Sequence, residues 1–179
     1  MFIRTKKIKT YSYAYLVENS WKKQSSRQKV KEYLGRVYEF GDTAIKDHPS
    51  LAELSFTESV RTLATAQVSA YGFTETVLDG NTLFAKDELL FDPKTFSFYH
   101  SRTKKPYVIK SFDGHLCTYT LKTLSEFNPE GMHEEQMGYE LARAFIAAGF
   151  HLPKELFVEL FVKIRPVQIA QKHYTEHPK

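Results

Sequence analysis

The chain has 179 residues and a formal net charge of +4, and 42% of its residues are hydrophobic, 26% charged and 15% aromatic. This length is enough to bury a full hydrophobic core without metals or disulfides, and the composition excludes collagen-like, disordered and disulfide-knotted proteins. The single cysteine, Cys117, and the lack of a signal-peptide pattern or of about 20 consecutive apolar residues predict a cytoplasmic protein that does not span a membrane.

Positive charge is concentrated at the N-terminus. Residues 1–40 hold ten Lys and Arg against three Glu, a net charge of +7, whereas the remaining residues carry −3. Such asymmetry favours a polyanionic partner, because cations near phosphates release condensed counterions. The alternative is a solvated sheet whose lysines only prevent strand-to-strand aggregation. The cations expected to contact nucleic acid are Arg4, Lys6, Lys7, Lys9, Lys22, Lys23, Arg27, Lys29 and Arg36.

The same segment has the periodicity of strands. Tyrosines occupy alternate positions from Tyr11 to Tyr15, so one face of this strand is expected to be aromatic. The polar residues 22–26 predict a turn, and residues 27–38 predict a returning strand that is broken or bulged at Gly35. With the basic run before them, these segments predict a three-stranded antiparallel β-meander. Tyr13 is a candidate for stacking on unpaired bases, although the tyrosines as a group can instead pack on the rest of the protein.

Part of this segment also resembles a known family. The strings YAYLVE at 13–18 and RQKVKEYLGRV at 27–37, after the leading FIRTKKIK, resemble the opening segment of bacterial and archaeal insertion-sequence transposases of the DDE class. The most specific positions are Leu16, Val17, Glu18, Arg27, Gln28, Tyr33, Leu34, Gly35 and Arg36. The resemblance implies a shared small β module that faces nucleic acid. It implies no transposase activity, because the match stops after Phe40 and the chain is too short for the RNase H-like catalytic body of that family.

A loop-like linker over residues 41–50 is the expected domain boundary. Beyond it, Ser55 and Glu58 have the spacing of a capping box, which predicts a helix over residues 56–71 that Gly72 ends.

Residues 75–119 predict strands separated by turns, and hence an antiparallel sheet of four or five strands. Two Asp-Gly pairs, at 79–80 and 113–114, are expected to form two-residue hairpin turns because both residue types tolerate positive φ. Residues 116–127 are expected to form a strand that runs into a short helix.

The C-terminal part is predicted to be helical. Asn128 and Pro129 are expected to begin a helix that Gly149 ends, and Pro153 is expected to begin another. This last helix is apolar on nearly every side, so it must be buried within its own domain or in a partner. The homodimer seam that the second option predicts would use Leu156, Phe157, Leu160 and Phe161.

Together these elements predict an α+β fold in which a three-stranded meander is followed by an antiparallel sheet and about three to four helices. The expected domains are a basic β-meander module (1–40), an α+β body (41–166) and a polar tail (167–179).

Catalytic motifs of the common nucleotide-binding, metallopeptidase, hydrolase and redox families are absent from the sequence. Three weaker patterns remain. His173 and His177 have helical metal-ligand spacing without a recognisable third ligand, so no metal site is expected. A Cys117 and His115 pair could form a thiolate and imidazole, although core packing explains the same residues. The last pattern, either a metal-independent ribonuclease site or an ordinary basic loop, comprises Tyr99, His100, Arg102, Lys104 and Lys105.

The sequence therefore favours a non-catalytic nucleic-acid-binding protein without a cofactor. Its partner would be RNA or DNA, free or within the ribosome or another ribonucleoprotein, and Arg102, Lys104 and Lys105 would extend the basic surface of the N-terminal module. The alternatives are a small metal-independent nuclease and a purely protein-binding dimeric module.

Overall fold

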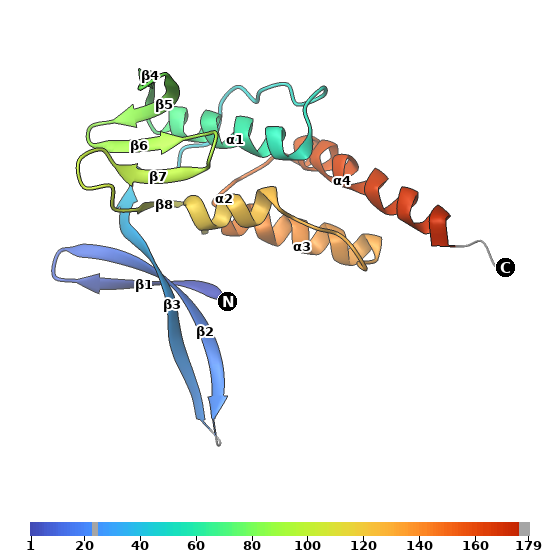
Figure 1. The fold of residues 1–179 in the computed structure, drawn as a ribbon, viewed down its shortest axis with the longest axis horizontal. Helices are drawn as coiled ribbons and strands as arrows, with labels where there is room; N and C mark the ends of the chain where they lie inside the picture. The colour runs from blue at the N-terminus through green and yellow to red at the C-terminus, as the bar shows by residue number, and fades with distance from the viewer. Residues whose placement is uncertain (23–24, 176–179) are drawn as a thin grey trace.

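Strand-forming residues dominate the first 39 positions, and the computed structural model of the protein places them in three consecutive antiparallel strands (Figure 1). These are β1 (Phe2–Ile8), β2 (Tyr11–Lys22) and β3 (Ser25–Glu39), which confirms the predicted meander. The structure describes residues 1–22 and 25–175, and of residues 21, 22, 25, 26 and 166–175 it describes the backbone only. In this part of the chain two sheets and four helices make an α+β fold, as predicted.

The β2–β3 ladder contains the expected irregularity near Gly35. Ala14 is opposite Gly35 but Tyr15 is opposite Tyr33, so Leu34 is an extra residue in β3. Gly35 has a φ of +128°, which side chains rarely adopt, and a Cβ atom there would lie 2.3 Å from the carbonyl oxygen of Pro106. Glycine is therefore required both by the backbone conformation and by the close approach of the segment that leads into the next strand of the sheet.

The N-terminal sheet continues into the body of the protein. β3 pairs in parallel with β8 (Tyr107–Ser111), and β8 pairs with β9 (Gly114–Leu116), which gives the strand order β1-β2-β3-β8-β9. The sheet thus runs across the expected boundary at residue 41. The sequence placed the strand near residue 107 in the second sheet, and this prediction is wrong because its hydrogen bonds go to β3.

The second sheet is a four-stranded antiparallel meander of β4 (Thr74–Leu78), β5 (Asn81–Lys86), β6 (Leu89–Asp92) and β7 (Ser97–His100). Its first turn confirms one Asp-Gly prediction, since Asp79 and Gly80 both have positive φ between the paired residues Leu78 and Asn81.

The other Asp-Gly prediction is wrong by one residue. Ser111 pairs with Gly114, so the two-residue turn of the β8–β9 hairpin is Phe112 and Asp113. Gly114 lies inside β9, where a Cβ atom would come within 1.9 Å of the carbonyl oxygen of Ile146. Its role is close packing rather than turn formation.

The described helices are α1 (Phe56–Ala70), α2 (Thr118–Ser125), α3 (Glu134–Ala147) and α4 (Lys154–Thr175) (Figure 1). α1 packs on the second sheet, α2 and α3 pack on β9, and α4 packs on α1 and α3. The Ser55 and Glu58 capping box and the positive φ of Gly72 confirm the predicted ends of α1. Gly149 follows α3 with a φ of +80°, as expected.

One helix prediction at the C-terminus needs correction. The N-cap of α3 is His133 and not Asn128, whose side-chain oxygen instead accepts a hydrogen bond from the amide of Glu130 in a local turn. The predicted tail begins at residue 167, but the backbone of α4 is helical through Thr175. His173 and His177, the expected histidine pair, lie outside the residues whose side chains are described.

The main core lies among the second sheet, β8 and the helices, and α4 contributes to it from one side. Leu156 and Leu160 are only 7% and 0% exposed within the single chain. Phe157 and Phe161 are half-buried and pack against the same core. The predicted homodimer seam through these four residues gains no support, because two of them are fully used in the core of the monomer.

None of the helices in the described part of the chain combines the length and apolar character that a membrane span requires.

Candidate nucleic-acid interface

The register of β1, β2 and β3 gathers tyrosines and cations on one face of the sheet. Residues directly opposite each other share a face. Tyr13 lies between Lys6 on β1 and Arg36 on β3, while Tyr15 is opposite Arg4 and Tyr33. We call this surface the tyrosine face, and it comprises Arg4, Lys6, Tyr11, Tyr13, Tyr15, Tyr33, Arg36 and Tyr38.

The opposite face of the same strands is the packing face. Ala14 and Leu16 are buried there in a small cluster with Leu34, Val108 and Cys117. β2 therefore packs on the body through its small and aliphatic residues, and Tyr11, Tyr13 and Tyr15 lie on its other face. Tyr38 of β3, in contrast, packs against the main core, as the packing alternative expected for the tyrosines.

The tyrosines support one another. The ring of Tyr33 lies 5.5 Å from that of Tyr15 and 6.3 Å from that of Tyr13, in tilted arrangements. Burial, and then the neighbouring Tyr13 and Tyr15, raise the pKa of Tyr33. Tyr11 and Tyr33 are nevertheless 45% and 40% exposed. The cluster thus presents ring surface to solvent while its neighbours restrict the rotation of each ring.

Arg36 is held between two aromatic rings. Its guanidinium carbon lies 3.8 Å from the ring centre of Tyr11 and 4.8 Å from that of Tyr38. Such cation–π contacts fix the side chain without neutralising its charge. Arg4 donates from Nη1 to the side-chain oxygen of Gln28, which also leaves its charge uncompensated.

Acidic residues of the three strands lie away from this face. Glu32 is opposite the buried Leu16, and Glu18 forms an ion pair of 2.9 Å with Lys31. Glu39 follows Tyr38 and so projects to the other side of β3. Among the described residues of these strands, the positive charge of the tyrosine face has no carboxylate beside it.

The structure brings together only part of the predicted contact set. Arg4, Lys6, Tyr13 and Arg36 meet on the tyrosine face. Lys7, Arg27 and Lys29 lie on the opposite side of their strands, and Lys9 lies in the β1–β2 turn. Lys22 and Lys23 fall outside the described side chains.

The predicted second basic patch adjoins the tyrosine face through a hydrogen bond. The hydroxyl of Tyr38 lies 3.2 Å from Nε2 of His100, the last residue of β7. In the loop that follows, Arg102 pairs with Glu88 at 3.2 Å, and Lys104 lies 5.3 Å from the ring centre of Tyr99. The backbone carbonyl of Lys105 accepts a hydrogen bond from the amide of His100.

These contacts differ from what a ribonuclease site requires. A general acid-base histidine needs its ring nitrogen directed at substrate, and a phosphate-stabilising arginine needs its charge available. Here Nε2 of His100 faces Tyr38, and the charge of Arg102 is paired with Glu88.

Sequence reasoning selected Tyr13 but left out Tyr11, Tyr15, Tyr33 and Tyr38 as site residues. The alternation from Tyr11 to Tyr15 contained the signal for the first two of these. Tyr33 could not be placed, because the extra residue at Leu34 changes which β3 side chains share the face with Tyr15.

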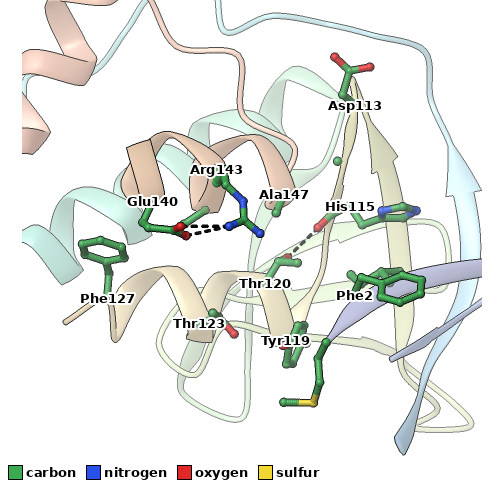
Figure 2. Close-up of a pocket in the computed structure, with 14 residues that line it drawn as sticks. Phe2, Asp113, His115, Tyr119, Thr120, Thr123, Phe127, Glu140, Arg143 and Ala147 are labelled. Atoms are coloured by element: carbon green, nitrogen blue, oxygen red, sulfur yellow. Dashed lines mark hydrogen bonds and ion pairs between the residues drawn. The ribbon is translucent and has the colours of Figure 1, made fainter. Parts of the chain in front are cut away.

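A cavity of about 460 Å³ lies on the packing side, between the start of β1, β9, α2 and α3 (Figure 2). Figure 2 shows His115 and Phe2 at one end and Phe127 at the other, with the Glu140 and Arg143 ion pair on α3 between them. The volume is in the range of small-molecule pockets, but its two ionic side chains on α3 bind each other.

The Cys117 and His115 pair does not have the electrostatics of a catalytic dyad. Burial raises the pKa of the Cys117 thiol, and burial followed by the nearby Lys110 lowers the pKa of His115 to about 4. Both shifts favour the neutral forms, whereas a thiolate–imidazolium pair needs the reverse. The Cys117 sulfur instead lies 3.5 Å from the hydroxyl of Thr120, within the small cluster. Among the described residues, no three His, Cys, Asp or Glu side chains are placed to hold a metal ion.

The state of His115 predicts how stability responds to acid. Unfolded histidine titrates near 6.5, so between pH 6.5 and about 4 the unfolded chain binds a proton that the folded chain does not. As the pH is lowered through this window, the free energy of unfolding should therefore fall. The expected loss is about 2 kcal/mol, after a reduction for the partial exposure of the ring. Urea unfolding at a series of pH values measures this, and His115→Gln should flatten the profile. The control His48→Gln, at an exposed position, should leave the profile unchanged. Equal profiles for the two variants would show that His115 is not the cause of the loss of stability in acid.

No protein-family model matches the chain, and no curated protein or solved structure shows a significant match to it. The resemblance of residues 13–37 to transposase N-terminal segments therefore stays a prediction.

Proposed function

We propose that this chain is a nucleic-acid-binding protein and that the tyrosine face is its contact surface. The observation that carries the proposal is the placement of Arg4, Lys6 and Arg36 among partly exposed tyrosines on one side of a sheet. The partner is RNA or DNA, free or within a ribonucleoprotein such as the ribosome.

Two features support this function over a solvated sheet. Cations that only prevent aggregation need no fixed geometry, whereas Arg36 is clamped between Tyr11 and Tyr38 and Arg4 is bonded to Gln28. Restricted cations lose less rotational entropy on binding a phosphate. The tyrosine rings between these cations also expose apolar surface to water. A contiguous exposed patch of this kind does not aid solubility and is typical of a binding site.

Neutralising the cations of the face should weaken binding. We expect the triple variant Arg4→Gln, Lys6→Gln, Arg36→Gln to bind labelled RNA or DNA about tenfold or more weakly at low salt. The slope of log affinity against log salt should become shallower by about two to three, since each lost phosphate contact releases one counterion fewer. Fluorescence anisotropy across a salt series measures both quantities.

A matched control removes the same charge elsewhere. Lys46, Lys94 and Lys154 are exposed and lie outside the three N-terminal strands, so their triple substitution by Gln should leave the slope nearly unchanged. Equal losses in the two triple variants would indicate an effect of net charge alone. Affinity of the intact protein that does not vary with salt would refute the proposal.

A further inference from the structure

We infer that the tyrosine face binds single-stranded RNA, with unpaired bases stacked on the tyrosine rings and the ribose 2′-hydroxyls bonded to the tyrosine hydroxyls; this rests on the proposed function and specifies its ligand.

The arrangement of rings and charges fits a single strand. Tyr13 has a cation directly opposite it on each neighbouring strand, Lys6 and Arg36, and Tyr15 has Arg4 on one side and Tyr33 on the other. A strand crossing the sheet would therefore meet ring surface and positive charge in turn. Stacking needs exposed base faces, which a duplex keeps inside its helix. Sequence-tolerant single-strand binding uses this combination of aromatic platforms and backbone cations.

The shape of the surface also disfavours a duplex. The tyrosine face lies where β2 is paired on both sides, with β1 and with β3, so its side chains form a surface several strands wide; the two-stranded ribbon of β2 and β3 begins only beyond Val17. The duplex groove that best admits protein is the DNA major groove, which takes a helix or a two-stranded ribbon. The major groove of double-stranded RNA is too narrow for side chains to read.

The tyrosine hydroxyls point to RNA rather than DNA. Within the described part of the chain, no hydrogen bond engages the hydroxyls of Tyr13, Tyr15 and Tyr33, whereas the hydroxyl of Tyr38 is paired with His100. A tyrosine hydroxyl can both donate and accept a hydrogen bond at neutral pH. A ribose 2′-hydroxyl both donates and accepts, and it is the group that lets a protein distinguish RNA from DNA.

The test compares three labelled probes of equal length at one salt concentration: oligouridylate, oligodeoxyuridylate and a double-stranded RNA. We expect the intact protein to bind oligouridylate at least about tenfold more tightly than the duplex, and more tightly than oligodeoxyuridylate. Tyr33→Leu removes a ring and should weaken oligouridylate binding by about tenfold. Tyr33→Phe keeps the ring but removes the hydroxyl, so it should retain most of the affinity and reduce the preference for RNA over DNA.

The control is Tyr139→Leu, because Tyr139 is 65% exposed on α3, away from the N-terminal sheet. Circular dichroism verifies folding, and if Tyr33→Leu fails to fold, the Phe variant and the three probes still decide the matter. Salt-dependent binding that favours the duplex, or is equal for RNA and DNA, would overturn the inference and leave the proposed function intact. Absence of salt-dependent binding to every probe would overturn both.

Discussion

Gly35→Ala is expected to destabilise the protein by about 3–5 kcal/mol and to abolish the proposed nucleic-acid binding by the tyrosine face. The new methyl group would meet the carbonyl oxygen of Pro106 at 2.3 Å and its carbonyl carbon at 2.5 Å, and both are backbone atoms that cannot rotate away. The φ of +128° adds conformational strain for any residue with a Cβ atom. Overpacking and backbone strain each cost about 1–3 kcal/mol, so their sum is a large fraction of the stability of a typical domain.

The loss of function follows from where Gly35 lies. It adjoins Arg36, which pairs with Tyr107 at the start of the parallel β3–β8 ladder. A shift of β3 away from Pro106 would move Arg36 out of its position between Tyr11 and Tyr38. The sheet and the interface should therefore fail together.

Urea unfolding and anisotropy with single-stranded RNA measure the two effects of Gly35→Ala. The matched control is Gly41→Ala, since Gly41 also has a positive φ, +82°, but nothing lies within 4 Å of its Cβ position. We expect this control to cost about 1–2 kcal/mol from strain alone and to leave binding unchanged. A Gly35→Ala protein as stable as the Gly41→Ala protein would show that the contact with Pro106 does not constrain β3.

Gly114→Ala is expected to be the second severe substitution, with a cost of about 3–4 kcal/mol or more. Its Cβ atom would lie 1.9 Å from the carbonyl oxygen of Ile146 and 2.5 Å from the amide nitrogen of Gly149. The end of α3 packs directly on β9 at this point, so the clash would push the helix off the sheet. Thermal or urea unfolding measures the loss.

A second glycine in the same region provides the control for Gly114. Gly138 lies within α3, and a Cβ atom there would make an ordinary contact of 3.6 Å with the ring of Phe161. Gly138→Ala should stabilise the protein by about 0.5–1 kcal/mol, because alanine loses less backbone entropy in a helix. Opposite signs at the two positions are the expected result, and a destabilised Gly138→Ala variant would count against the packing described for α3.

Local sequence patterns were sufficient wherever neighbouring residues decide the structure. The capping box at Ser55 and Glu58, the Asp79 and Gly80 turn and the closure of α3 at Gly149 all depend on contacts within a few residues, and each was predictable. The N-terminal meander was predictable for the same reason, since β1, β2 and β3 are consecutive.

Predictions failed where a distant segment decides the role of a residue. Asp113-Gly114 reads as a turn, yet Gly114 is placed in a strand because the end of α3 needs the space. Asn128 precedes a proline and resembles a helix cap, yet its side chain closes a turn of its own. The strand beginning at Tyr107 pairs with β3, which no local pattern specifies.

The candidate site was likewise predictable only in part. The sequence alone showed the concentration of cations near the N-terminus and the alternation of Tyr11, Tyr13 and Tyr15. Which cations share a face with those tyrosines depends on the strand pairing. Lys7 is opposite Ser12 and Lys29 is opposite Glu18, so both project from the other side, although they were grouped with Arg36 by charge alone.

The parallel β3–β8 ladder has a consequence for synthesis. β3 ends at Glu39 and its partner begins at Tyr107, so the ribosome must add the whole second sheet before the ladder can form. At about 5–20 residues per second this delay lasts for several seconds. During it the meander has an unpaired edge at β3, and the packing face around Ala14 and Leu16 is uncovered. Pairing between segments so far apart in the sequence is intrinsically slow and exposes strands to aggregation. The nascent chain is therefore prone to aggregate during the time in which β3 has been made but β8 has not.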